Sequence, residues 1–228
     1  MELQGHIQVF LAEKMFEGCG GLKLTDEIRA TIAAHACLLL LHRQTDYYPA
    51  LKTVLVYPTT YVVPTTRHVG SGVMHESHES RAGEAWQEGA VVLAWDAVCN
   101  GVRAPEYGYN VVLHEFAHLL DFENGLADGI PLLGRGRSLS ERNRRYAVWS
   151  EVMKTEYERL RTEVERGEAT VLREYGATNR VEFFAVATEC FFCKPDAMQR
   201  RHADLYEEMK WFYQQDPARW LLPKNINL

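Results

Sequence analysis

The chain has 228 residues, of which 46% are hydrophobic and 25% are charged, ordinary proportions for a folded globular protein. Its formal net charge of −6 at pH 7 argues against a protein that binds nucleic acid directly, because such proteins are usually basic. The longest apolar run, residues 30–41, is interrupted by Thr31 and His35 and is too short to span a bilayer, so no membrane partner is expected.

The N-terminus and the cysteines indicate the compartment. The chain opens without the basic segment and apolar core of a signal peptide. Its five cysteines are an odd number without the spacing of a disulfide framework. Cys190 and Cys193 form the one closely spaced pair, and we interpret them as packing residues of a helix. We therefore expect a cytoplasmic protein.

The first long helix is predicted to begin after Thr25, whose side chain can cap it, and to run to about Arg43. Apolar positions recur along it at helical spacing and predict one buried face. That face consists of Ile28, Ile32, His35, Ala36 and Leu39.

Three short strands are predicted next, over residues 53–57, 60–63 and 90–95, with Pro58 separating the first two. Residues 65–89 lie between the second and third strands and are rich in glycine, serine and charged side chains. They include His68, His75 and His78. We interpret this segment as a solvated loop, with a lid over a cleft as the alternative.

Residues 114–118 form an H-E-x-x-H pattern inside an apolar run. Positions i and i+4 of a helix share a face, so His114 and His118 can reach one metal ion. Glu115 between them is then placed to accept a proton from an activated water molecule. Zinc suits such a site because it accepts neutral imidazole nitrogens and a carboxylate and leaves a fourth position open.

The boundaries of this helix are also predictable. Asn110 is a suitable N-cap, and Asn124-Gly125 supplies a C-terminal stop. The alternative, that both histidines are ordinary core residues, is disfavoured. Burying two imidazoles and a carboxylate without partners costs several kcal/mol.

A third metal ligand has to come from elsewhere in the chain. The metzincin pattern would continue the pentad with a glycine and a further ligand, but those positions hold Asp121 and Asn124. The remaining option is a carboxylate on a second helix. Residues 175–192 are helical by period and apolar, and they carry Glu182 and Glu189 about two turns apart on one side.

Each of the two carboxylates has another interpretation. Glu182 lies three residues after Asn179 and could close a capping box at the start of the helix. Glu189 lies in a thick apolar stretch and needs a partner such as a ligand histidine. Spacing alone does not choose the ligand between them.

Two further groups have simpler interpretations. An arginine cluster near a helix start is interpreted as a solvated face, with a partner surface as the alternative. It comprises Arg135, Arg137, Arg142, Arg144 and Arg145. A C-terminal stripe at helical spacing is interpreted as packing. It comprises Leu205, Tyr206, Met209, Phe212 and Tyr213.

Taken together, several segments resemble the Mlc titration factor A family, bacterial zinc peptidases with a gluzincin-like catalytic domain. The resemblance covers nearly the whole chain. The segments that carry it are residues 21–26, 54–58, 81–86, 91–96, the pentad 114–118, Tyr175 and residues 182–192.

This resemblance implies an α+β, zincin-like fold with a small mixed sheet, an active-site helix bearing the pentad and further packing helices. It implies His114, His118 and Glu182 as ligands of one Zn²⁺ per chain, Glu115 as general base and Tyr175 as the residue that stabilises the oxyanion. Glu189 then has a supporting role behind the ligands, for which Asp121 is a weaker candidate.

The resemblance also implies a single metallopeptidase domain, with a helical part over residues 1–45, a catalytic core over 46–193 and a C-terminal helical part over 194–228. Residues 90–94 would form the edge strand that pairs with an extended peptide substrate. The expected activity is zinc-dependent peptide hydrolysis, and aminopeptidase and endopeptidase action both remain open. The alternative is a regulatory protein that sequesters a transcriptional repressor of the Mlc type, with catalysis secondary.

Overall fold

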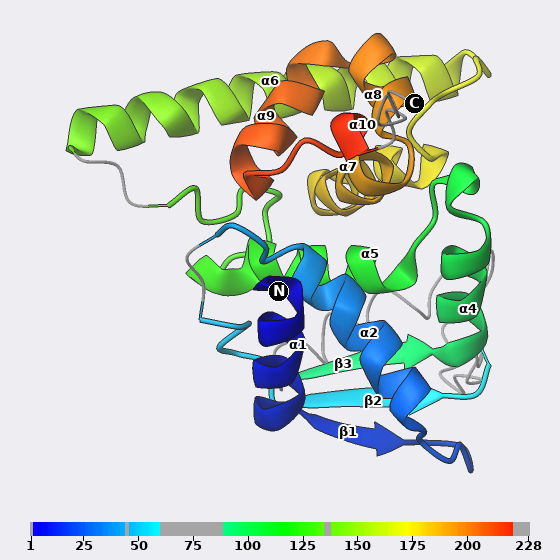
Figure 1. Ribbon diagram of the computed structural model, residues 1–228. Helices are drawn as coiled ribbons and strands as arrows, with labels where there is room; N and C mark the ends of the chain where they lie inside the picture. Colours follow the sequence, from blue (N-terminus) through cyan, green and yellow to red (C-terminus); the bar gives the residue numbers. More distant parts are fainter. Residues whose placement is uncertain (1, 44–45, 60–88, 135–137, 221–228) are drawn as a thin grey trace, which may run out of the picture.

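The computed structural model describes residues 2–43, 46–59, 89–134 and 138–220 (Figure 1). The N-terminal part consists of α1 (Glu2–Glu13), β1 (Met15–Gly18), α2 (Asp26–Leu38), β2 (Thr53–Tyr57), β3 (Ala90–Ala94), α4 (Trp95–Arg103) and η1 (Pro105–Tyr107). The remaining elements are α5 (Val111–Asp121), η2 (Phe122–Asn124), α6 (Leu139–Glu165), η3 (Glu174–Ala177), α7 (Arg180–Cys193), α8 (Pro195–Arg201), α9 (Ala203–Tyr213) and α10 (Pro217–Trp220).

The three described strands form a parallel sheet in the order β1-β2-β3. Met15 pairs with Thr53, and Thr53 pairs in turn with Ala90. The α+β fold expected from the sequence is confirmed, and the described part of its small sheet is entirely parallel. The chain returns from β1 to β2 through α2, and such a crossover brings the second strand back in the same direction as the first. The predicted strand over residues 60–63 lies outside the described residues.

Several boundaries differ from the sequence predictions. The first predicted helix is α2, which Thr25 caps as expected by accepting a hydrogen bond from the Ile28 N–H, but it ends at Leu38 rather than near Arg43. The sequence analysis did not predict α1, β1 or α4. The third predicted strand ends at Ala94, because α4 begins at Trp95. His68, His75 and His78 lie outside the described residues.

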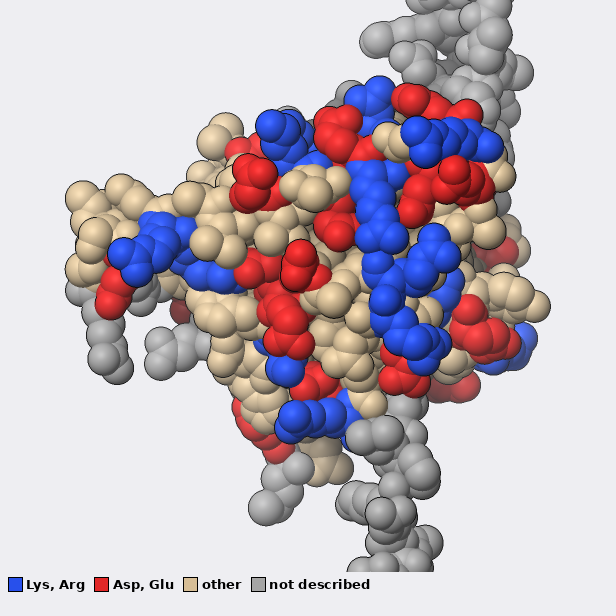
Figure 2. Space-filling view, turned by 90° about the horizontal axis from the view of Figure 1, so that it is seen from above, with Lys and Arg blue, Asp and Glu red and all other residues tan. Residues whose placement is uncertain are grey.

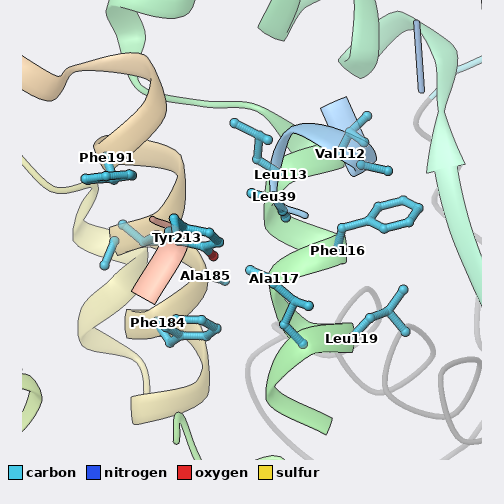
Figure 3. Packing of buried hydrophobic residues seen from close by; sticks show 14 of the residues in the cluster. Leu39, Val112, Leu113, Phe116, Ala117, Leu119, Phe184, Ala185, Phe191 and Tyr213 are labelled. Carbon is cyan, nitrogen blue, oxygen red and sulfur yellow. The ribbon is translucent and has the colours of Figure 1, made fainter. Parts of the chain in front are cut away.

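The pentad helix α5 lies at the centre of the molecule, between the sheet and α7 (Figure 1). Leu113 and Ala117 are on the side that faces α7, whereas Phe116 points the other way (Figure 3). The Phe116 ring contacts the rings of Phe10 from α1 and Tyr48 from the segment before β2. Because both sides of α5 are covered, its sequence is apolar nearly all round.

The far side of α7 is covered by α6, α8 and α9 (Figure 1). The predicted C-terminal packing stripe is confirmed, since all five of its residues are buried. Burial raises the pKa of the Cys190 and Cys193 thiols to about 12, as expected for thiols enclosed among apolar side chains. Thr188 of α7 and Tyr213 of α9 share a hydrogen bond of 2.9 Å inside this layer.

The outer face over α6, α8 and α9 carries basic and acidic side chains side by side (Figure 2). Arg159 pairs with Glu163, and Arg161 pairs with Glu165, one turn further along α6 in each case. Of the predicted arginine cluster, Arg142 and Arg144 are exposed, Arg135 and Arg137 lie outside the described residues, and Arg145 pairs with Glu208 while covering the Trp211 ring. No helix in the described part of the chain combines the length and apolar character needed to cross a membrane.

The N-cap of α5 gives a test of how the pentad helix is held. The buried Asn110 side chain accepts hydrogen bonds from the N–H groups of Val112 and Leu113, both at 3.1 Å. Asn110→Ala should lower the free energy of unfolding by about 1–2 kcal/mol, measured by urea denaturation. Ser138 caps α6 on the exposed surface, so Ser138→Ala is the matched control and should cost only about 0.5 kcal/mol. Equal costs for the two variants would contradict this ranking.

Candidate metal centre

Two imidazoles come together on one face of α5. The Nε2 atoms of His114 and His118 are 3.2 Å apart, and both residues are buried. Their spacing of one helical turn makes this geometry possible, and the Asn110 cap holds the turn just before His114. The structure thus brings the two histidines of the pentad together at one point.

Glu182 enters the same point from α7. Its Oε2 lies 3.0 Å from Nε2 of His114, and its Oε1 lies 3.4 Å from Nε2 of His118. Asn179 caps α7 by accepting a hydrogen bond from the Glu182 N–H at 2.9 Å. The capping interaction expected at this helix start therefore uses the backbone of Glu182, and its carboxylate is turned to the imidazoles.

These three side chains fit a metal ion. In the described part of the chain they are the one group of histidine, cysteine and carboxylate side chains whose ligand atoms all lie close together, within 4.8 Å of one another. Zinc with ligands about 2.0–2.1 Å away in a tetrahedron requires ligand atoms roughly 3.3 Å from each other. The two Nε2 atoms are 3.2 Å apart, and each lies 3.0 or 3.4 Å from an oxygen of Glu182, a different oxygen in each case, so these separations are close to that value.

Glu189 lies behind His114, on the opposite side of its ring. The carboxylate is fully buried and accepts hydrogen bonds from His114 Nδ1 at 2.7 Å and from the Asn110 backbone N–H at 2.6 Å. Arg173 completes the arrangement through an ion pair of 2.5 Å to the same carboxylate. The two carboxylates of α7 therefore contact different nitrogens of the same imidazole.

The site carries an excess of negative charge. Burial lowers the pKa of His114, but hydrogen bonds to Glu182 and Glu189 more than offset this and raise that pKa to about 10. Burial raises the pKa of Glu182, yet hydrogen bonds from His114 and His118 bring it down to about 2. Burial dominates at His118 and lowers its pKa. Such a cluster attracts a cation, which can be a proton or a metal ion.

Glu115 and Tyr175 lie beside this group. Glu115 is half-buried on α5, close enough to His114 to raise the pKa of that imidazole further. Tyr175 comes from η3, and its ring centroid is 5.9 Å from that of His114. All five site residues expected from the sequence are thus found in one region.

Two neighbours were missed by the sequence analysis. The Tyr109 phenol is partly buried, and burial together with the nearby Glu189 raises its pKa. Arg173 lies over the Tyr109 ring at 4.7 Å and over the Tyr175 ring at 5.7 Å. Neither belongs to a motif, so only the folded chain reveals their proximity.

Asp121, the weaker candidate for a supporting role, has a contact of a different kind. Its fully buried carboxylate accepts a hydrogen bond from the Gly129 N–H at 2.8 Å. Gly129 has a φ of +78°, and a Cβ at this position would lie 2.6 Å from the Arg180 carbonyl oxygen. Asp121 therefore fixes the loop that packs against the start of α7, two residues before Glu182.

The central helix with its H-E-x-x-H pattern, the adjoining sheet and the His-His-Glu group define a zincin-like metallopeptidase. Comparison with known families agrees, because the family model described as glucose-regulated metallo-peptidase M90 matches residues 1–214. The chain belongs to this family.

Individual relatives support the same assignment. The chain is 34% identical over 213 residues to Mlc titration factor A of Klebsiella pneumoniae (strain 342), covering 92% of this chain and 77% of the relative. It is 32% identical over 211 residues to the protein of that name from Cronobacter sakazakii, covering 91% and 76%. A Synechocystis protein, slr2042, is 41% identical over 217 residues, covering 95% and 76%. The resemblance to the Mlc titration factor A family is thereby confirmed.

The buried Asp121 carboxylate predicts a pH effect on stability. Burial raises its pKa to about 7, although the hydrogen bond from Gly129 opposes the shift. Between its ordinary pKa and this raised value, the folded state binds more protons than the unfolded state, so stability falls as the pH rises through this window. From pH 5 to pH 8, the unfolding free energy of the wild type should fall by about 1–3 kcal/mol more than that of Asp121→Asn.

The measurement is urea denaturation of both proteins at the two pH values, in the same metal-loading state. The variant keeps an acceptor for the Gly129 N–H but cannot ionise, and the other titrating groups are common to both proteins. Parallel pH dependence in the two proteins would rule out ionisation of Asp121 as the cause.

Proposed function

We propose that the protein is a zinc-dependent peptidase in which His114, His118 and Glu182 bind one zinc ion. Glu115 is the general base, and Tyr175 stabilises the oxyanion. The observation that carries this proposal is the buried group of His114, His118 and Glu182, whose ligand atoms lie within 4.8 Å of one another, with Glu115 on the same helix as the two histidines. Membership of a metallopeptidase family supports the reaction class.

Each side chain has a defined task in this proposal. A zinc ion at the site supplies Lewis acidity, which makes a water molecule easier to deprotonate and a carbonyl easier to attack. Glu115 accepts the proton of the attacking water and passes it to the leaving amine. The Tyr175 hydroxyl donates a hydrogen bond to the negative oxygen that develops on the substrate carbonyl.

Glu189 acts on the orientation of a ligand. By accepting the Nδ1–H of His114, it favours the tautomer whose Nε2 lone pair is available to the proposed zinc ion. The same carboxylate receives the Asn110 N–H, so the start of α5 and the ring of its first histidine are held by one group. In this assignment Glu189 tunes the site without binding the metal.

The sheet offers support for a peptide as the substrate. In the described part of the sheet, β3 is an outer strand, and it packs near α5. An extended peptide can add to such an edge through main-chain hydrogen bonds, which recognise little of its side-chain sequence. We propose β3 as this edge and a peptide as the substrate. A cytoplasmic location, expected from the cysteine pattern, remains part of the proposal.

A second role is supported by the names of the relatives. Several are called Mlc titration factor A, which points to an interaction with a transcriptional repressor. Such binding would be compatible with catalysis. A pull-down with repressor candidates, beside a peptide-hydrolysis assay with and without chelator, separates the two roles.

The general base is tested by Glu115→Gln, which preserves the shape of the side chain. Because Glu115 is not a proposed ligand, zinc content after dialysis should match the wild type. Peptide hydrolysis should fall by at least about 100-fold, since glutamine cannot accept the proton. Chelator-treated wild type serves as the control for metal-free protein. Parallel loss of zinc and activity in the variant would contradict the assignment.

Zinc titration distinguishes the roles of the two carboxylates of α7. Glu182→Ala should lose zinc to a mild chelator that leaves the wild type loaded, with an affinity loss above about 100-fold, because it removes a ligand. Glu189→Ala should lose about 10–100-fold in zinc affinity and some stability, because it leaves His114 Nδ1 and the Asn110 N–H without their acceptor. A greater loss of zinc affinity for Glu189→Ala would instead indicate His114, His118 and Glu189 as ligands.

A further inference from the structure

Arg173 joins parts of the site that come from three places in the sequence. It directly precedes η3 and stands two residues before Tyr175. Its Nη2 donates to Oε1 of Glu189 at 2.5 Å. Its guanidinium also faces the rings of Tyr109, before α5, and Tyr175, at 4.7 and 5.7 Å from their centroids. One planar cation therefore contacts α7, the approach to α5 and the η3 turn.

The connection to Glu189 anchors the guanidinium. Glu189 is fully buried and is held independently by the His114 ring and the Asn110 backbone, so its position is determined without Arg173. The ion pair therefore restrains the arginine side chain more than it restrains Glu189. The restrained guanidinium can in turn hold the tyrosine rings that it lies over.

The backbone of η3 is held close to the helices behind it. The Gly176 N–H donates to the Arg173 carbonyl at 3.0 Å, and the Thr178 N–H donates to the Tyr175 carbonyl at 3.1 Å. A Cβ on Gly176 would lie 3.1 Å from Leu160 and 3.2 Å from Val186, so the turn has little space there. These contacts place the Cα of Tyr175, whereas its ring lies 5.9 Å from the His114 ring and 5.7 Å from the Arg173 guanidinium.

We propose that Arg173 is the positioning residue for Tyr175: anchored on Glu189, its guanidinium holds the tyrosine ring beside His114, where the hydroxyl meets the substrate oxyanion. This inference rests on the proposed peptidase function for its catalytic consequence. Arginine suits the task because its planar, always charged group can pair with a carboxylate and lie against aromatic faces at the same time. Lysine offers a point charge and cannot do both.

The kinetic test is a double-mutant cycle with zinc-loaded protein. Arg173→Met should lower kcat by about 10–100-fold with KM changed by less than about 3-fold and with wild-type zinc content, because a transition-state contact is displaced. In Arg173→Met combined with Tyr175→Phe, kcat should lie within about 3-fold of that of Tyr175→Phe alone, since both changes remove the same contact. Arg166→Met, at a solvent-exposed arginine, is the matched control and should behave as the wild type.

Arg173→Lys separates positioning from simple charge compensation. Arg173→Lys should have a higher free energy of unfolding than Arg173→Met, because a cation again faces Glu189. Its kcat should nevertheless stay at least about 5-fold below that of the wild type. Full recovery of kcat by lysine, or multiplicative effects of the Arg173 and Tyr175 changes, would overturn the proposal and leave Arg173 with a structural ion pair only.

A second measurement does not depend on activity. The ring resonances of Tyr175, observed by NMR with tyrosine-selective labelling and assigned with Tyr175→Phe, report where the ring lies and how freely it turns. In Arg173→Met these resonances should shift and the ring should flip at least about 10-fold faster. Hydrogen exchange of the Gly176 and Thr178 amides should stay unchanged, because other contacts hold that backbone. Wild-type ring resonances and flip rate in Arg173→Met would refute the positioning role even in an active peptidase. If the wild type fails to hydrolyse peptides, the peptidase proposal fails, and the ring resonances still decide whether Arg173 holds the Tyr175 ring.

Discussion

A carboxylate that is removed from water has to find partners, and at Glu189 this requirement organises the centre of the molecule. Its side chain is fully buried, and its two oxygens accept from a backbone N–H, an imidazole and a guanidinium. These donors come from the start of α5, from the first pentad histidine and from the segment before η3. Displacing any of these segments would leave a buried charge short of a partner, at a cost of several kcal/mol.

The apolar surroundings make this polar centre possible. Packing of α5 against α7 through residues such as Leu113, Ala117 and Ala185 brings the two helices close enough for Glu182 to reach both imidazoles (Figure 3). The same packing excludes water, which strengthens every electrostatic interaction between the site residues. Glu115, Glu182 and Glu189 face two imidazoles and one arginine there, so a bound cation improves the charge balance.

Different contacts fix the ends of α5 and α7 and the distance between the two helices. Asn110 and Asn179 satisfy the first backbone donors of α5 and α7, which leaves the carboxylate of Glu182 available to the imidazoles. Asp121 holds the loop around Gly129 against the start of α7. The helix ends are thereby fixed relative to each other by hydrogen bonds, while the apolar faces determine how closely the helices approach.

Local spacing was sufficient to predict much of this arrangement. The separation of His114 and His118 puts both rings on one side of a helix, because a helix repeats every 3.6 residues. Asn110 marks the start of this helix as predicted, whereas Gly125 ends the 3-10 turn η2 that follows α5, and α5 itself already ends at Asp121. The apolar setting of Glu189 required a buried partner wherever the chain folded. These inferences depend only on neighbours in the sequence.

Other features depended on contacts between distant segments. Glu182 and Glu189 lie on the same side of α7, so only the packing of α7 on α5 decides which of them meets Nε2 of His114 and which meets Nδ1. The parallel direction of β1, β2 and β3 follows from how the connections cross the sheet, which short apolar strands do not reveal. Arg173 belongs to no periodic pattern, and its proximity to the rings of Tyr109 and Tyr175 exists only in the folded chain. The sequence by itself determined the chemistry of one helix face, and tertiary packing decided its partners, because helix periodicity is local whereas the approach of two helices is set by the whole core.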